Sequence, residues 1–219
     1  MKNHLYLPAL ILCMLASNAN AQAENFQGVD IQLGLGYQST TGTGSLQDPT
    51  NGAGTLDNAH LGSIATSLGL SYTAAVSDQI SLGALLETNP LKLKAGSARA
   101  TPPATYKVSA YDETFRSVSS FSLVPGYAID YTHLAYAKLG YTSTSAVFSS
   151  NDGSADSSEK LNGYNFGLGL RVDTGNFYPF AEFNYLKLKS TPNVVSNGTG
   201  VMTQGGSAYN LIGGIGYHF

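Results

Sequence analysis

Apolar and polar residues alternate along segments of about ten residues, and this two-residue period is the strongest constraint on the fold. Residues 29–38 read VDIQLGLGYQ, in which odd-numbered residues are apolar and even-numbered residues are polar or glycine. Successive side chains of a strand point to opposite faces. A tilted strand crosses a bilayer in about 9–11 residues. The segment therefore predicts a membrane-spanning strand with one apolar and one polar face.

The pattern recurs seven more times, in residues 64–72, 80–86, 121–129, 133–141, 165–173, 178–189 and 209–219. In the two least regular segments we assign Lys138 and Glu182 to the polar face, which leaves Tyr136 and Phe180 there as well. Pro125 lies within a predicted strand and cannot donate a ladder hydrogen bond, so a β-bulge is expected there.

The gaps between these segments alternate in length. Short gaps lie near residues 75–79, 130–132 and 174–176, and long gaps rich in Gly, Ser, Thr and Asn span residues 39–58, 88–114, 149–160 and 190–207. Short turns at one end and long loops at the other are typical of outer-membrane barrels. The sequence predicts an all-β fold, an eight-stranded antiparallel transmembrane β-barrel with short periplasmic turns and long extracellular loops.

The first residues have the three-part pattern of a secretory signal peptide. A basic start is followed by LYLPALILCMLA, which is too short to span a bilayer, and then by SNANAQA. We assign residues 1–21 to the signal peptide and residues 22–219 to the barrel. The Ala-x-Ala pattern occurs twice, so cleavage before Gln22 and cleavage before Glu24 both fit. The chain's only cysteine, Cys13, lies in this signal.

The composition agrees with a membrane barrel. Charged residues make up 11% of the chain, against about 25% in typical globular proteins. A formal net charge of -3 provides no electrostatic footprint for nucleic acid, so no nucleic-acid partner is expected.

Four charged residues are assigned to the inner face: Lys138, Arg171, Glu182 and Asp30. A charge inside a narrow barrel requires a partner. Our hypothesis is that Arg171 pairs with Glu182, that Lys138 lies nearby, and that this network plugs the lumen. A narrow ion path lined by the same residues is the alternative, although eight strands leave little free bore.

The segments LVPGYAI and AYAKLGY, together with the terminal GYHF, resemble the porin-like, opacity-type family of small outer-membrane β-barrels. The resemblance covers essentially the whole chain after the signal and implies no catalytic residue. It implies that the terminal strand is a recognition signal for the barrel-assembly machinery. Leu211, Ile215, Tyr217 and Phe219 match that signal.

The best candidate for enzymatic chemistry is His60 with Asp57 and Ser63, ahead of His133, which lies near Asp130 and Thr132 at a predicted short turn, but a polar loop-to-strand junction has the same composition as the His60 group. No established catalytic or metal-binding pattern occurs, and neither a cofactor nor a metal is expected.

The sequence therefore favours a structural and surface-interaction protein rather than an enzyme. A small-solute porin is the alternative, and a lipid-modifying enzyme is a weaker one. Expected partners are outer-membrane lipids and lipopolysaccharide, the assembly machinery, and a surface ligand or host factor. Lys92, Lys94, Lys107, Lys187 and Lys189 either meet lipopolysaccharide phosphates or form a solvated loop surface.

Overall fold

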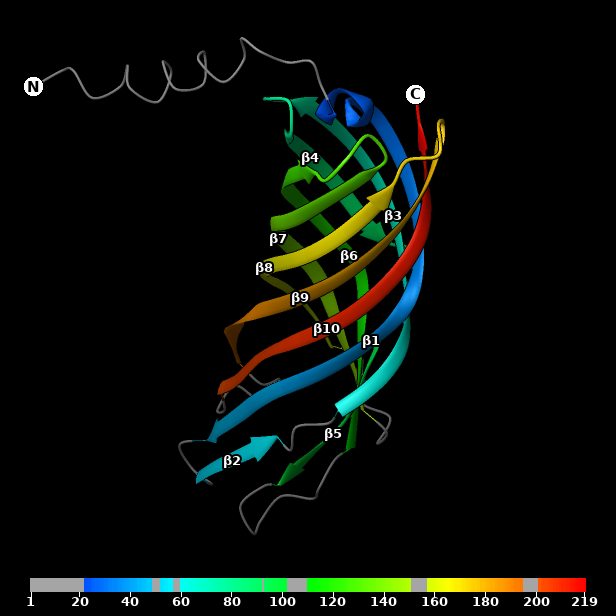
Figure 1. Cartoon of the computed structure of the whole chain (residues 1–219). Helices are drawn as coiled ribbons and strands as arrows, with labels where there is room; N and C mark the ends of the chain where they lie inside the picture. The colour runs from blue at the N-terminus through cyan, green and yellow to red at the C-terminus, as the bar shows by residue number, and fades with distance from the viewer. Residues whose placement is uncertain are drawn as a thin grey trace, which may run out of the picture.

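Eight long antiparallel strands close into a barrel (Figure 1). The computed structural model describes residues 22–48, 52–56, 60–91, 93–101, 110–150, 157–194 and 201–219. The barrel strands are β1 (Gly28–Asp48), β3 (His60–Ala75), β4 (Ile80–Asn89), β6 (Ala110–Ala128), β7 (His133–Ser150), β8 (Ser157–Val172), β9 (Phe177–Val194) and β10 (Val201–His218). Pairing of β10 with β1 closes the barrel. The predicted fold class is confirmed.

The two faces of the wall follow the predicted alternation. In β1 the outward Leu33 and Leu35 are each 62% exposed, whereas the inward Asp30 is 1% exposed. Large apolar and aromatic side chains cover the outside, while the buried side chains inside include many polar ones. This arrangement suits a wall whose outer surface lies in lipid rather than in water.

The short turns occur where the sequence predicts them, at residues 76–79, 129–132 and 173–176. We call this end of the barrel the short-turn end and the opposite end the long-loop end. The predicted long loops are too long, because strand structure continues into each of them. β1 has 21 residues, about twice the number needed to cross a bilayer. Gly-, Ser- and Thr-rich segments still form ladders, since backbone pairing does not require apolar side chains.

Two short strands, β2 (Gly52–Leu56) and β5 (Leu93–Thr101), lie within predicted loops at the long-loop end (Figure 1). β2 pairs with β1 and with β5, and β5 pairs with β6. At the long-loop end, β2 and β5 thus continue the wall between β1 and β6, and β3 and β4 occupy the same place in the wall nearer the short-turn end.

The bulge predicted at Pro125 is wrong. The register between β6 and β7 is the same on both sides of Pro125, with Leu123 opposite Leu139 and Gly126 opposite Tyr136. The register shift lies nearer the long-loop end, between Arg116 and Ser119. Ser117 has a positive φ of 53° there, so backbone conformation, and not a missing proline donor, causes the irregularity.

A short 3₁₀ helix, η1 (Ala23–Phe26), fills the short-turn end of the barrel. Ala23 and Phe26 are fully buried against Ala128 and Leu134. Figure 1 shows η1 at the same end as the C-terminus. Within the described part of the chain, no helix is long and apolar enough to cross a bilayer.

Candidate functional site: charged layers across the lumen

A buried lysine bridges two carboxylates in the middle of the lumen. The Nζ of Lys138 on β7 lies 2.7 Å from Glu87 Oε2 on β4 and 2.9 Å from Glu182 Oε2 on β9. Glu182 also accepts hydrogen bonds from the Tyr136 hydroxyl at 2.8 Å and the Asn184 amide at 3.2 Å. The side chains of Lys138 and Glu182 are each 1% exposed. The network therefore compensates each buried charge with a partner, as such a site requires.

A second charged layer lies nearer the short-turn end. Arg171 on β8 donates from Nη1 to Asp30 Oδ2 on β1 at 3.1 Å. His218 Nδ1 lies 2.7 Å from the other oxygen of Asp30. The Arg171 guanidinium carbon is 3.6 Å from the centroid of the Tyr178 ring, a cation–π contact. This layer thus joins strands from both sides of the closing seam.

The four residues predicted to form the lumen cluster all lie inside the barrel, but the predicted pairing is wrong. Glu182 bonds Lys138, and Arg171 bonds Asp30. No ion pair joins Arg171 to Glu182, although the structure describes both side chains. Strand alternation indicates which face a side chain occupies, whereas barrel tilt and stagger decide which residues meet across the lumen.

Sequence reasoning missed Glu87, Tyr178 and His218. Glu87 follows the outward Leu86, so the alternation already assigns it to the inner face. The predicted strand, however, ends at Leu86, and the predicted long loop begins at residue 88. The alternation places His218 on the inner face of the terminal strand but assigns it no partner. The strand alternation could have assigned these three residues to the inner face, but it could not have predicted their partners.

The two layers divide the free space inside the barrel. A cavity of about 80 Å³ lies on the long-loop side of Lys138 and is lined by Glu87, Asn184 and many hydroxyl and amide side chains. A smaller cavity of about 40 Å³ is lined by Asp30, Arg171, Tyr178 and Glu182. The two cavities share no lining residue. Glu87 lines the larger cavity and Glu182 lines the smaller one, so the ion-paired layer around Lys138 lies between them.

Inward glycines make room for the tyrosines of these layers. A Cβ added at Gly169 would collide with the Tyr136 ring, and one added at Gly216 would collide with the Tyr178 ring. Each tyrosine lies directly across the ladder from its glycine. The glycines thus allow two aromatic rings to cover neighbouring strands inside a narrow barrel.

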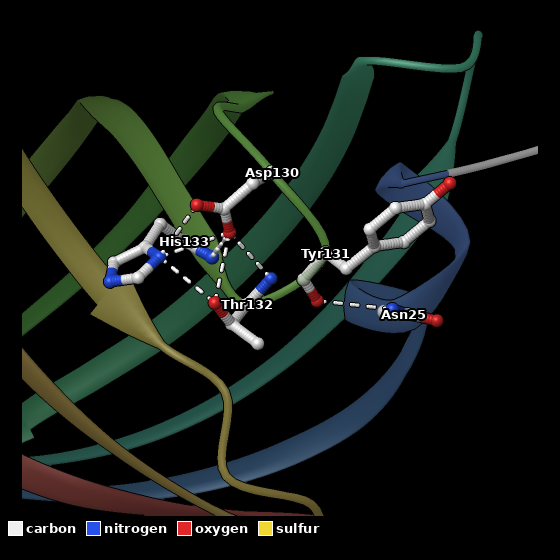
Figure 2. A network of polar contacts seen from close by, with 5 residues as sticks. All are labelled: Asn25, Asp130, Tyr131, Thr132 and His133. Atoms are coloured by element: carbon white, nitrogen blue, oxygen red, sulfur yellow. Dashed lines mark hydrogen bonds and ion pairs between the residues drawn. The ribbon is translucent and has the colours of Figure 1, made fainter.

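The β6–β7 turn carries a separate polar cluster, shown in Figure 2. The Asp130 carboxylate accepts hydrogen bonds from the backbone N–H groups of Thr132 and His133, each at 2.8 Å. His133 Nδ1 lies 2.9 Å from both Asp130 Oδ2 and the Thr132 hydroxyl. Because acid and hydroxyl meet the same ring nitrogen, the imidazole cannot relay a proton between them as a catalytic triad does. The cluster stabilises a turn, and the Asn25 amide bonds the Tyr131 carbonyl beside it at 3.0 Å.

This turn gives a pH prediction. The Thr132 backbone N–H, with the His133 ring and the Thr132 hydroxyl, holds the pKa of Asp130 far below its ordinary value. A lowered folded-state pKa contributes stability that is present above the ordinary value and is lost as the pH falls toward the folded-state value. We expect the Asp130 carboxyl to stay ionised at about pH 3, where an ordinary aspartate is mostly protonated. Carboxyl ¹³C shifts would measure this, and titration near the ordinary value would contradict it.

The sequence-predicted catalytic group lies largely outside the described residues. Asp57 is not described, and His60 is described only in its backbone, at the start of β3. The Ser63 hydroxyl oxygen is buried and has no hydrogen-bond partner. Among the described residues, no group of three or more His, Cys, Asp or Glu side chains is arranged to hold a metal ion.

The proposed assembly-signal residues share the outward face of the closing strand. Leu211, Ile215 and Phe219 are 62%, 60% and 67% exposed, and Tyr217 is 36% exposed. Tyr217 packs edge-on against Phe177 and Phe219. An apolar, aromatic C-terminal strand is therefore accessible from the outside of the barrel.

The sequence matches the family described as outer membrane protein β-barrel domain over residues 9–219. Several solved structures are similar to the chain over most of its length at low identity. OprG of Pseudomonas aeruginosa is 16% identical, with a TM-score of 0.51, over 91% of this chain and 99% of that one. The Escherichia coli protease OmpT is 11% identical, with a TM-score of 0.50, over 87% and 97%. The attachment invasion locus protein Ail of Yersinia pestis is 16% identical, with a TM-score of 0.45, over 86% and 99%. No curated protein matches the sequence.

Proposed function

Because the chain belongs to the outer membrane protein β-barrel domain family, we propose that it is a surface-interaction protein whose barrel is closed to solutes. The observation that carries this proposal is the buried bridge of Lys138 to Glu87 and Glu182. A solute would have to break two short ion pairs at this layer and leave charges unpaired in a buried site, which is costly.

The strands that continue toward the long-loop end support the surface role. β2 and β5 extend the wall between β1 and β6, so the barrel carries ordered backbone well beyond its charged layers. Binding residues in proteins are often carried by loops held on a rigid scaffold. A surface ligand or host factor would bind at the long-loop end. Lipopolysaccharide would surround the part of the wall that lies nearer the short-turn end. The assembly machinery would recognise the outward face of β10.

The second candidate, a small-solute channel, is favoured by the polar side chains that line the outer cavity. Its lining includes Gln38, Ser67, Asn165 and Asn184, and oxygens of the last three have no hydrogen-bond partner. Water molecules typically satisfy such groups. The cavity ends at the Lys138 layer, however, and this is why we rank the closed barrel first. A lipid-modifying enzyme ranks third, because the Asp130, Thr132 and His133 side chains lack the geometry of a proton relay.

Vesicles loaded with a small sugar test the proposal. We expect proteoliposomes containing the folded chain to release the sugar no faster than protein-free vesicles, whereas vesicles with a general porin release it rapidly. Release that increases with the number of barrels per vesicle would favour the channel.

A further inference from the structure

We propose that the outward face of β6, β7, β8 and β9 near the long-loop end binds a phosphate-bearing glycolipid of the outer leaflet through Arg116, Lys160, Lys187 and Lys189. The proposal rests on the proposed function in one respect, that the long-loop end faces the cell exterior. It does not depend on whether the lumen is closed.

On the described wall, acidic side chains occur only on the inner face, whereas basic side chains occur on both faces. Four described cations point outward: Arg116 on β6, Lys160 on β8, and Lys187 and Lys189 on β9. Among the side chains that the structure describes, no aspartate or glutamate shares that face. Of the wall acids whose side chains are described, Asp30, Glu87 and Glu182 all point inward, and the other described acids lie on η1 or in the short turns. The outward cations therefore have no acidic partner near them on the described wall.

The four cations occupy one sector of the barrel. Arg116 and Lys160 flank Ser145 in the ladder, so the three lie in one row across β6, β7 and β8. Lys187 lies opposite Tyr164, and the Nζ of Lys189 is 5.0 Å from the centroid of the Tyr164 ring. Neighbouring strands are about 4.8 Å apart, so one charged headgroup can reach several of these side chains.

An apolar groove lies next to the cations, on the side toward the short-turn end. It has a volume of about 350 Å³ and is lined by Leu139, Tyr164, Phe166, Tyr185 and Lys187. Tyr141 packs edge-on against Tyr164 beside it, with ring centroids 6.0 Å apart. Tyrosines mark the interface between lipid chains and headgroups. An acyl chain in the groove would therefore place its headgroup at the level of Lys187 and Lys189.

The chemistry of this surface selects the ligand. Apolar walls bind an acyl chain, and clustered cations bind phosphate. The surface lies toward the long-loop end, where the outer leaflet carries phosphorylated glycolipid. A phospholipid from the inner leaflet or a second copy of the barrel would need the groove at another depth or an acidic partner surface. We therefore commit to lipopolysaccharide as the occupant.

The test compares lipopolysaccharide binding by the folded full-length mature chain in phosphatidylcholine nanodiscs, measured by native mass spectrometry. The test variant carries R116Q, K160Q, K187Q and K189Q, and the matched control carries K160R, K187R and K189R. Each lysine or arginine near an anionic lipid surface strengthens binding to that surface by about fivefold in affinity. We expect the glutamine variant to lose about fivefold or more per cation and the arginine control to bind like the wild type. The four side chains are exposed, so a cold-versus-boiled gel shift should show equally folded barrels.

Three results would overturn the proposal. The first is equal binding of dephosphorylated lipopolysaccharide, which would mean that the acyl chains alone are recognised. The second is equal affinity for phosphatidylglycerol, which would mean that any anionic lipid fits. The third is unchanged binding by the glutamine variant. None of these results bears on solute release from vesicles, so failure here is distinguishable from failure of the closed-barrel proposal.

A second inference concerns processing and rests on a different observation: we infer that the signal is removed between Ala21 and Gln22. Ala23 is fully buried, and its backbone N–H donates to the Asp78 carbonyl at 2.9 Å. Hydrolysis after Ala21 leaves this residue in place, with the new ammonium group on Gln22. Hydrolysis after Ala23 would remove the buried methyl group and the donor, and would put the ammonium of Glu24 beside an apolar cluster.

Mass spectrometry of the N-terminal peptide from outer membranes tests this assignment. We expect a peptide that begins with Gln22, or with its cyclised form after loss of ammonia from the glutamine amide. A peptide that begins with Glu24 would overturn the assignment. In addition, a chain made to begin at Glu24 should unfold at a lower urea concentration than one that begins at Gln22, and an equal midpoint would overturn the structural reason given for it.

Discussion

Replacing Lys138 with methionine is expected to destabilise the barrel by about 3–5 kcal/mol, the usual cost of removing one partner from a buried ion pair. The substitution keeps a long apolar stem but leaves Glu87 and Glu182 without the ammonium group that both contact. Urea unfolding in detergent micelles, followed by the gel shift between folded and unfolded barrel, measures the change.

Lys187→Met is the matched control, because it removes a lysine that is exposed on the outward face. It should change the unfolding free energy by less than about 0.5 kcal/mol, as is usual for surface substitutions. Adding E87Q and E182Q to the Lys138→Met variant should recover part of the loss, since neutral amides bury at lower cost than unpaired carboxylates. An unfolding midpoint for Lys138→Met equal to that of the wild type would contradict the importance of the bridge.

Gly36→Ala is expected to prevent closure of the barrel. A Cβ at Gly36 would collide with the Leu211 carbonyl and lie 2.7 Å from the Ile212 Cα, both of which are backbone atoms of β10 across the seam. Backbone in a ladder cannot move aside as a flexible side chain can, so the cost should exceed the ~1–3 kcal/mol typical of core overpacking. The measurement is the yield of the fast-migrating folded band after refolding into detergent.

Gly213→Ala is the control for this substitution. Gly213 lies one ladder position away, opposite Leu35, and faces outward. The nearest atom to its added Cβ is the Phe180 carbonyl oxygen at 3.9 Å, an ordinary contact. This variant should refold like the wild type. Similar refolding yields for the two variants would show that the seam tolerates a side chain at Gly36.

Much of the fold was predictable because strand alternation is a local property. The outward Leu33 and the inward Asp30 follow directly from the two-residue period. The strand ends at the long-loop side were not predictable. A change to polar residues on the outward face indicates where a strand leaves the lipid, but its backbone hydrogen bonds can continue beyond that point. β1 continues to Asp48 and pairs with β10 throughout, through residues that read as loop.

The candidate site was predictable only in part, for a geometric reason. Lys138 and Glu182 are assigned to the lumen by parity alone, and both are buried there. Glu182 lies opposite Gly169 of β8. Arg171 is two residues from Gly169 on one side. Gly167, which pairs with Lys138, is two residues from Gly169 on the other side. Parity cannot choose between these two cations. The choice depends on the tilt of the strands and on Glu87, which reaches Lys138 from β4 across the lumen.

The most direct test of the central claim, that the Lys138 layer closes the lumen, is single-channel conductance in planar bilayers. We predict that the wild-type barrel inserts without steady openings, because the ion-paired Lys138 layer lies between its two inner cavities. Steady nanosiemens-scale openings from the wild-type barrel would contradict the claim.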